Sequence, residues 1–116
     1  MKLGCVIMAA GASLRFGSNK LLQTLGGIPL YRRALEAVPE NVFSAVCVVT
    51  ACRPMEELAK AMGFEVVRND RPELGISRSI RLGLETMLSC DGVLFMTADQ
   101  PLLTKNSVRA VAEAFE

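Results

Sequence analysis

The sequence predicts an α/β fold in which a doubly wound, mainly parallel sheet carries helices on both faces. Four short apolar runs are continuous rather than alternating, as in strands buried on both faces of a parallel sheet. These runs are Leu3 to Met8, Ala45 to Thr50, Phe64 to Val67 and Val93 to Thr97. Helical spacings follow each run, so the predicted order is βαβαβαβα. Ligands of such sheets bind beyond the carboxyl ends of the strands.

Four helices are predicted from apolar residues that recur at helical spacing. The first begins near Pro29, which suits an initial helical turn, after a tight turn at Gly26-Gly27. The second stops at Gly63, the third runs from about Ser77 to Ser89, and the fourth starts at Thr104. The predicted inward faces are Leu30, Ala34, Leu35 and Val38; Met55, Leu58, Ala59 and Met62; Ile80, Leu84, Met87 and Leu88; and Val108, Val111, Ala112 and Phe115.

Composition excludes several classes of function. The chain has 116 residues, of which 51% are hydrophobic, enough for one domain with an apolar core. Its 13 basic and 12 acidic residues give a net charge of +1, which predicts neither a nucleic-acid partner nor a membrane surface. The chain has no histidine, and its 4 cysteines form no C-x-x-C pair, which argues against a zinc site, a Cys-His nucleophile and a Ser-His-Asp triad. Free cysteines and the lack of a membrane-length apolar stretch predict a cytoplasmic location.

The segment VIMAAGASLRFGSNKLL, residues 6 to 22, permits two interpretations. Lys2, the apolar run up to Ala9 and the small residues Ala10-Gly11-Ala12 resemble an export signal with a cleavage site. The apolar run is short for such a signal, however, and it has the Val and Ile content of a buried strand. We therefore favour the second interpretation, a strand that leads into an anion-binding loop.

The residues of this first loop suit phosphate binding. Gly11 and Gly17 permit positive φ and allow backbone N–H groups to approach an anion. Arg15 and Lys20 can neutralise phosphate oxygens, the arginine through its fork of donors and the lysine as a point charge. The glycine spacing matches neither G-x-G-x-x-G nor the G-K-[ST] end of a Walker loop, so dinucleotide binding and P-loop ATPase chemistry are less favoured.

Asp99 ends the fourth apolar run, in the sequence LFMTADQPLL. A carboxylate at this edge of the sheet, opposite a basic phosphate loop, is suited to hold Mg²⁺ against phosphate oxygens. The alternative role is that of a helix-capping or turn aspartate. Segments 9 to 20, 50 to 53, 68 to 77 and 98 to 103 all follow strands and are expected at one edge, although ordinary turn composition would explain any one of them.

Several motifs follow one another along the chain, and together they carry a resemblance. They are Ala9-Ala10-Gly11-x-Ser13-x-Arg15-Phe16-Gly17-x-x-Lys20, Gly27-x-Pro29-Leu30, Asn69, Gly75-x-Ser77-x-Ser79, Gly83-Leu84 and Asp99-Gln100-Pro101. In this combination the chain resembles the molybdenum cofactor cytidylyltransferase group of the NTP transferases. The first motif alone is shared by many NTP transferases and sugar-nucleotide pyrophosphorylases.

The resemblance implies a nucleotide-diphospho-sugar transferase fold, which is Rossmann-like and glycosyltransferase-A-like. It implies Mg²⁺-dependent transfer of CMP from CTP to the terminal phosphate of molybdopterin, with release of pyrophosphate and a molybdenum hydroxylase as a partner that receives the product. Arg15, Lys20 and Asp99 would be catalytic, with Asp99 also the metal ligand. The residues implied in substrate binding are Ala9, Ala10, Gly11, Ser13, Gly17, Thr50, Asn69, Gly75, Ser77 and Ser79.

Two alternatives stay open beside this function. One is another NTP transferase, of the guanylyl or sugar-nucleotide type, and the other is a catalytically silent nucleotide- or cofactor-binding accessory module. The resemblance covers the first part of such a domain, so residues 1–116 are expected to be the nucleotide-binding portion of a domain truncated at its C-terminus, with little turnover alone. The basic residues Arg68, Arg71, Arg78 and Arg81 are either a seat for an anionic acceptor or solvated surface arginines.

Overall fold

The computed structural model describes residues 2–8, 24–39, 42–69, 76–97 and 104–114, and every structural statement below concerns these residues. Four strands form the main sheet: β1 (Leu3–Met8), β4 (Ala45–Thr50), β5 (Glu65–Arg68) and β6 (Gly92–Thr97). A separate hairpin pairs β2 (Thr24–Leu25) with β3 (Ile28–Pro29). The helices are α1 (Leu30–Glu36), α2 (Arg53–Ala61), α3 (Ile76–Thr86) and α4 (Lys105–Glu113).

The main sheet is parallel throughout, with the strand order β5-β4-β1-β6. β1 lies inside the sheet between β4 and β6, and all six of its residues are buried. Val6 of β1 lies opposite Cys47 of β4 and Phe95 of β6, which fixes the register of all three strands. The continuous apolar run of β1 is therefore explained by helices that cover both of its faces.

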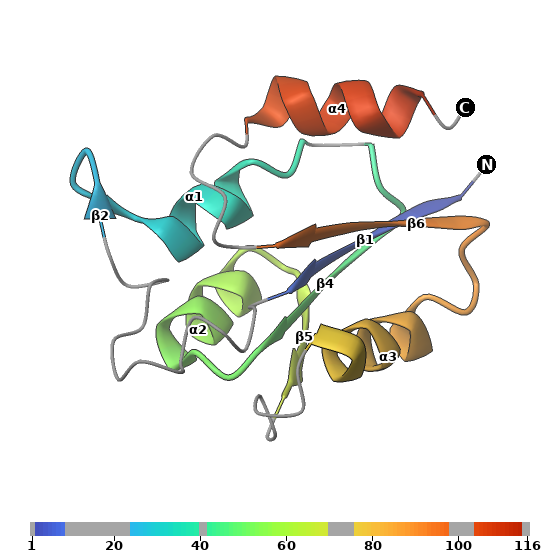
Figure 1. Cartoon of the computed structure of the whole chain (residues 1–116), viewed down its shortest axis with the longest axis horizontal. Helices are drawn as coiled ribbons and strands as arrows, with labels where there is room; N and C mark the ends of the chain where they lie inside the picture. The colour runs from blue at the N-terminus through green and yellow to red at the C-terminus, as the bar shows by residue number, and fades with distance from the viewer. Residues whose placement is uncertain (1, 9–23, 40–41, 70–75, 98–103, 115–116) are drawn as a thin grey trace.

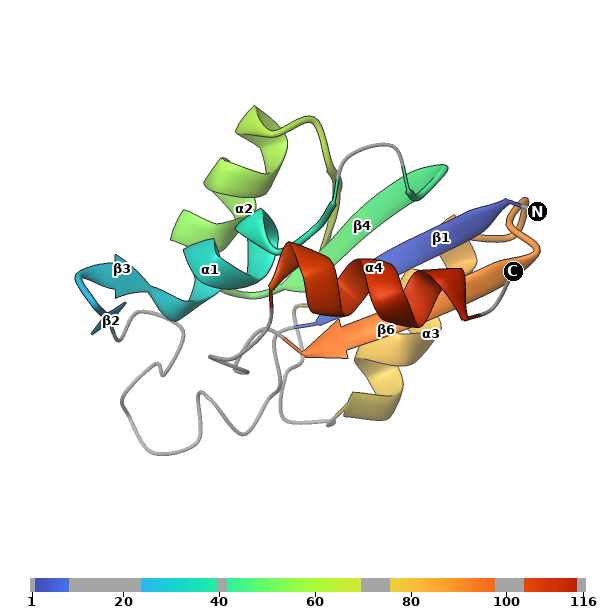
Figure 2. The same ribbon diagram turned by 90° about the horizontal axis from the view of Figure 1, so that it is seen from above.

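The helices divide unequally between the two faces of the sheet. On one face, α1, α2 and α4 pack against β1, β4 and β6 around Ile7, Leu35 and Met55. On the other face, α3 is the one described helix that packs against β1 and β4, around Val6 and Met87. Figure 1 shows α4 and α3 on opposite sides of β1 and β6, and Figure 2 shows the same arrangement from above. The predicted doubly wound α/β fold is thus confirmed.

The strand and helix predictions hold with small shifts in their boundaries. β5 begins one residue later than expected because Phe64, although apolar, precedes the strand and packs against the core. Gly63 ends α2 with a φ of 85°, and Thr104 caps α4, as predicted. The β2–β3 hairpin was not foreseen, because strands of two residues show no periodicity. Its turn does contain Gly26 and Gly27, with φ of 65° and 82°.

The predicted inward face of α3 is wrong at two positions. Leu84 is 43% exposed and Leu88 is 86% exposed, whereas Met87 is buried as expected. The buried positions on this side are instead Ser79 and Gly83 of α3, four residues apart, and Met87 just after the helix. Hydrophobicity favoured the leucines, but Val6 of β1 lies too close to Gly83 for a side chain at that position.

Two other predicted core residues are largely exposed. Met62 is 39% exposed because it follows the last residue of α2, and Val111 of α4 is 46% exposed. Of the remaining predicted inward residues, these are buried: Ala34, Leu35, Val38, Met55, Ala59, Val108 and Ala112. Leu58 and Ile80 are partly buried, while the side chain of Leu30 and all of Phe115 lie outside the description. Among the helices in the described ranges, none is long and apolar enough to cross a membrane.

Candidate functional site

The strands that lead to the predicted site end side by side. Met8, the last residue of β1, lies opposite Val49 of β4 and Thr97 of β6, and Thr50 of β4 lies opposite Arg68 of β5. All four strands are parallel, so their carboxyl ends form one edge of the sheet. The segments that were expected to converge therefore leave the sheet from neighbouring points on the edge where such folds bind ligands.

Many of the predicted site residues lie outside the described residues. These are Ala9, Ala10, Gly11, Ser13, Arg15, Gly17, Lys20, Gly75 and Asp99. Ser77 is in the first turn of α3, and its side chain is also outside the description. The roles predicted for these residues stay predictions. The described part of the predicted site consists of Thr50, Asn69 and Ser79.

Thr50, Asn69 and Ser79 form one hydrogen-bonded cluster at the carboxyl edge. The Nδ2 of Asn69 donates to the Oγ of Ser79 at 3.1 Å, and the backbone N–H of Asn69 donates to the carbonyl oxygen of Thr50 at 3.1 Å. The Oγ1 of Thr50 accepts a hydrogen bond from the backbone N–H of Cys52 at 2.9 Å. The cluster thus joins the ends of β4 and β5 to the first turns of α2 and α3.

Each polar side chain of this cluster is buried. Thr50 is 0% exposed, Asn69 is 3% exposed and Ser79 is 2% exposed. Buried polar groups of this kind stabilise a structure only while their hydrogen bonds are made, because an unpaired one carries the full cost of desolvation. The cluster therefore fixes the geometry of the backbone on either side of residues 70–75.

Arg68 is held by an acidic residue that the sequence analysis did not single out. Its Nη2 lies 3.1 Å from the Oε2 of Glu56 on α2, and the Nζ of Lys60 lies 3.2 Å from the Oε1 of the same carboxylate. The hydrogen bond from Arg68, followed by that from Lys60, lowers the pKa of Glu56. Of the four arginines proposed as an acceptor seat, Arg68 is thus engaged with α2, Arg81 is exposed, Arg78 is partly buried and Arg71 lies outside the description.

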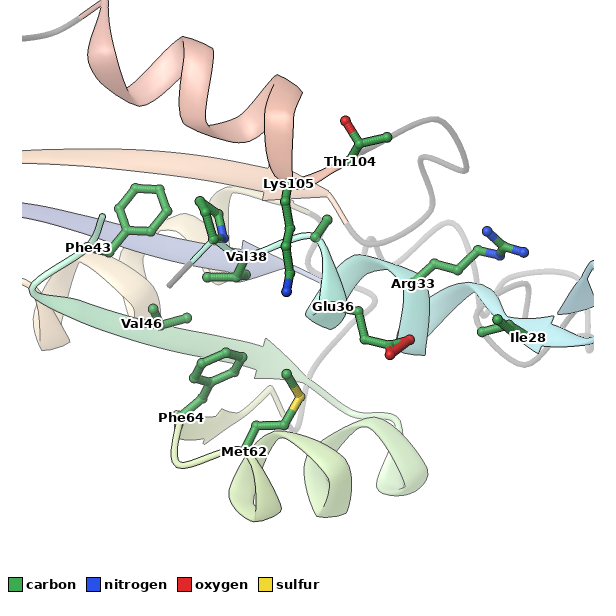
Figure 3. Close-up of a pocket in the computed structure, with 12 residues that line it drawn as sticks. Ile28, Arg33, Glu36, Val38, Phe43, Val46, Met62, Phe64, Thr104 and Lys105 are labelled. Atoms are coloured by element: carbon green, nitrogen blue, oxygen red, sulfur yellow. The ribbon is translucent and has the colours of Figure 1, made fainter. Parts of the chain in front are cut away.

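A groove of about 790 Å³ opens on the α1, α2 and α4 side of the sheet. Apolar side chains, including Phe43, Val46 and Phe64, form one part of its lining. Figure 3 shows Lys105 reaching toward it from the start of α4, with Arg33 and Glu36 coming from α1. The groove is lined by no member of the Thr50, Asn69 and Ser79 cluster. No sequence pattern predicted this groove, because its lining comes from segments far apart in the chain.

Two of the described cysteines, Cys5 and Cys47, are buried in the core. Burial, and then the neighbouring Cys47 thiol, raises the pKa of Cys5 to about 12, so its thiol stays protonated at neutral pH. Burial likewise raises the pKa of Cys47. Within the described ranges, no group of three or more His, Cys, Asp or Glu residues is arranged to hold a metal ion. Asp99 lies outside those ranges, so its role as a Mg²⁺ ligand stays a prediction.

Comparison with known proteins identifies a consistent set of relatives. The profile of the MobA-like NTP transferase domain matches residues 5–116. A probable molybdenum cofactor guanylyltransferase from Pyrococcus horikoshii is 31% identical over 116 residues, which cover 99% of this chain and 57% of that protein. A 3-deoxy-manno-octulosonate cytidylyltransferase from Bdellovibrio bacteriovorus is 31% identical, with coverage of 99% of this chain and 46% of that protein.

Solved structures agree with these relatives. The structure of a nucleotidyl transferase from Methanothermobacter matches with a TM-score of 0.72 and 27% identity, over 97% of this chain and 57% of that one. The chain thus spans about half the length of the proteins it matches. The names of these relatives include both guanylyl and cytidylyl transfer, and those that are named for the molybdenum cofactor are probable guanylyltransferases.

Proposed function

Because the chain belongs to the MobA-like NTP transferase domain family, we propose that it binds a nucleoside triphosphate at the carboxyl edge of its sheet and serves in nucleotidyl transfer. The observation that carries this proposal is the meeting of four parallel strand ends beside the buried cluster of Thr50, Asn69 and Ser79. That edge is where open α/β sheets bind nucleotides, and a rigid polar cluster there gives the flanking segments a fixed geometry.

The proposed reaction is transfer of a nucleoside monophosphate to a phosphate acceptor. An oxygen of the acceptor phosphate attacks the α-phosphorus, the bond from that phosphorus to the bridging oxygen breaks, and pyrophosphate leaves with the bonding electrons. The acceptor phosphate is already ionised at neutral pH, so no general base is needed and the absence of histidine is no obstacle. Catalysis of this kind depends mainly on positioning and charge stabilisation, which we assign to Arg15 and Lys20.

We assign the Mg²⁺ site to Asp99. Its carboxylate offers the hard oxygen ligands that Mg²⁺ prefers, and the bound ion would neutralise charge on the phosphate oxygens. The apolar strand β6 ends at Thr97 on the carboxyl edge of the sheet, and Asp99 follows two residues later in the sequence.

The proposed nucleotide is CTP, and the proposed acceptor is the terminal phosphate of molybdopterin, with a molybdenum hydroxylase as recipient of the product. The order of the motifs Gly75-x-Ser77-x-Ser79 and Asp99-Gln100-Pro101 supports this choice. GTP is the second candidate, since the relatives named for the molybdenum cofactor are probable guanylyltransferases. A third candidate is a nucleotide-binding module without turnover, because the chain spans about half the length of its relatives.

Calorimetric titration with CTP, GTP, ATP and UTP, with and without Mg²⁺, tests nucleotide binding. We expect CTP to bind most tightly, to require Mg²⁺, and to lose affinity in Lys20→Ala and Asp99→Ala. Matched controls are Lys105→Ala, an exposed lysine of α4, and Asp91→Ala, which lies at the opposite edge of the sheet beside Lys2. Preference for GTP would select the second candidate. The absence of any binding by the folded chain would contradict the proposal.

Release of pyrophosphate separates catalysis from binding alone. The chain is incubated with Mg²⁺, the preferred nucleotide and molybdopterin, and pyrophosphate is measured with a coupled enzymatic assay. Formation of pyrophosphate only when molybdopterin is present would support nucleotidyl transfer by this chain. Tight nucleotide binding without pyrophosphate release would favour the binding module instead.

A further inference from the structure

Helix α3 lies close against strand β1 at Gly83. A Cβ atom placed on Gly83 would lie 2.5 Å from the Cγ1 and 3.0 Å from the Cγ2 of Val6. Val6 is a completely buried residue of β1, and its branched side chain has little rotational freedom. The space between helix and strand at this point therefore admits glycine alone, unless α3 moves away from the sheet.

The close position of α3 against β1 also determines where Ser79 lies. Ser79 is four residues before Gly83, so both residues lie on one face of the helix, one turn apart. Both are buried against the sheet, and the Oγ of Ser79 accepts its hydrogen bond from Asn69 at 3.1 Å. A helix displaced at Gly83 would carry Ser79 outward and lengthen this bond beyond hydrogen-bonding distance.

We propose that Gly83 is a positioning residue of the nucleotide site. By allowing α3 to lie against Val6, it holds Ser79 on Asn69 and so fixes the start of α3 relative to Asn69 and Thr50, at the ends of β5 and β4. The inference rests on the proposed function, because it names a residue that shapes the same site without touching the nucleotide. Gly83 acts through Ser79 and Asn69 only.

The far end of the same interface supplies a matched control. A Cβ atom on Gly4 would lie 2.5 Å from the Sδ of Met87 and 3.0 Å from the Sγ of Cys90, just beyond α3. Gly4→Ala therefore perturbs the packing between β1 and the residues just after α3, through the flexible side chain of Met87, which is eight residues beyond Ser79 in the chain. The two alanine variants share a loss of packing but differ in their effect on Ser79.

The experiment compares Gly4→Ala, Gly83→Ala, Val6→Ala and the double variant Val6→Ala/Gly83→Ala. For each we measure the Kd of the preferred nucleotide, the Tm, and the NMR shift of the Asn69 side-chain NH₂ group. In the double variant, removal of both Cγ atoms of Val6 makes room for the new methyl group. If the double variant recovers affinity for the nucleotide, the loss in Gly83→Ala came from displacement of α3 from β1 and not from a general loss of stability.

We expect Gly83→Ala to weaken nucleotide binding by about ten- to a hundredfold and to shift the Asn69 NH₂ signal, since small displacements of a site are costly. The double variant should recover most of the affinity and the original signal, although its core is less well packed. Gly4→Ala should lower the Tm while leaving both the Kd and the Asn69 signal unchanged.

Two outcomes would overturn the inference. Gly83→Ala could match Gly4→Ala, with a lower Tm, an unchanged Kd and an unchanged Asn69 signal, or the double variant could fail to recover affinity although Val6→Ala alone binds normally. Failure of the proposed function looks different, because the unsubstituted chain would then bind no nucleotide before any variant is made.

Discussion

The two faces of the sheet are packed in different ways. Three helices cover one face, where large side chains such as Ile7, Leu35 and Met55 fill the core. A single helix, α3, covers the other, where the buried stripe nearest the proposed site consists of the small residues Ser79 and Gly83. Large apolar side chains bury the most surface, whereas small ones allow a close and specific approach.

Because of this difference, we expect the three-helix face mainly to stabilise the fold and the α3 face also to position the nucleotide site. The three-helix face buries more apolar surface, so substitutions there should mainly change the free energy of unfolding. On the α3 face, Ser79 is hydrogen-bonded to Asn69 at the carboxyl edge of the sheet. Substitutions on this face should therefore also change nucleotide binding. Measuring both quantities for each variant shows whether the two faces divide these tasks.

The largest effect is expected for Leu35→Ala on the three-helix face. Leu35 is completely buried, and truncation of such a residue leaves a cavity that costs about 2–5 kcal/mol. Urea unfolding measures this loss, and calorimetry should give an unchanged Kd for the nucleotide in the folded protein. Leu84→Ala, at a leucine of α3 that is 43% exposed, is the control and should cost far less. A change in Kd with Leu35→Ala would mean that the faces are not separate.

Ser79→Ala should have a smaller effect on stability but a clear effect on binding. It removes the acceptor of the Asn69 Nδ2 hydrogen bond in a buried place, which costs about 1–3 kcal/mol. The Kd for the nucleotide should rise at the same time, because Asn69 at the end of β5 loses its link to α3. Ser89→Ala, in the exposed turn after α3, should change neither quantity. An unchanged Kd for Ser79→Ala would limit the cluster to a structural role.

Thr104→Ala tests the N-terminal cap of α4, one of the helices on the three-helix face. The Oγ1 of Thr104 accepts from the backbone N–H of Ser107 at 3.1 Å, and the Oγ of Ser107 accepts from the backbone N–H of Thr104 at 3.0 Å. Loss of such a cap costs about 1 kcal/mol. Thr104→Ser keeps the hydroxyl and should unfold at nearly the same urea concentration as the original chain. Equal losses in both variants would show that the cap is not the cause.

Periodicity and composition predicted the fold correctly because the strands are buried on both sides. The continuous apolar run of β1 matched a strand buried on both faces, and the parallel sheet with helices on both faces followed from the alternation of strands and helices. The same reasoning placed Thr50 and Asn69 at one edge of the sheet, whereas Ser79 came from the family resemblance. Their hydrogen bonds join residues that lie at the ends of different elements, which is where the topology brings them.

The contacts within the site could not be predicted from the same patterns. The bond between Asn69 and Ser79 depends on how closely α3 lies on β1, and that distance depends on Gly83 and Val6, which are far apart in the sequence. For the same reason the inward face of α3 was assigned to Leu84 and Leu88 rather than to Ser79 and Gly83. Hydrophobicity identifies what can be buried, but it does not identify where a helix must come close.

The smallest effect on the free energy of unfolding is expected for a substitution of Glu56. Its dependence on pH can show whether a charged contact adds to the stability of the three-helix face. The carboxylate of Glu56 is 14% exposed and bridges Arg68 at the end of β5 and Lys60 on its own helix. Both partners are more than half exposed, so solvent weakens the attraction and the gain in stability is small. Because its pKa is lowered on folding, the ionised form is favoured in the folded state.

The sign of the pH dependence follows from that shift. The stabilisation by Glu56 is fully present above the ordinary pKa of 4.5 and is lost as the pH falls through the lower value of the folded state. Urea unfolding of Glu56→Gln should therefore differ from that of the original chain near neutral pH, and the difference should shrink in acid. Glu57→Gln is the control, because its partner Arg53 lies at 3.9 Å and both side chains are exposed. A difference that stays constant with pH would show that Glu56 acts through packing rather than through charge. The contact of Glu56 on α2 with Arg68 on β5 would then stabilise the fold in the same way as the apolar contacts of the three-helix face.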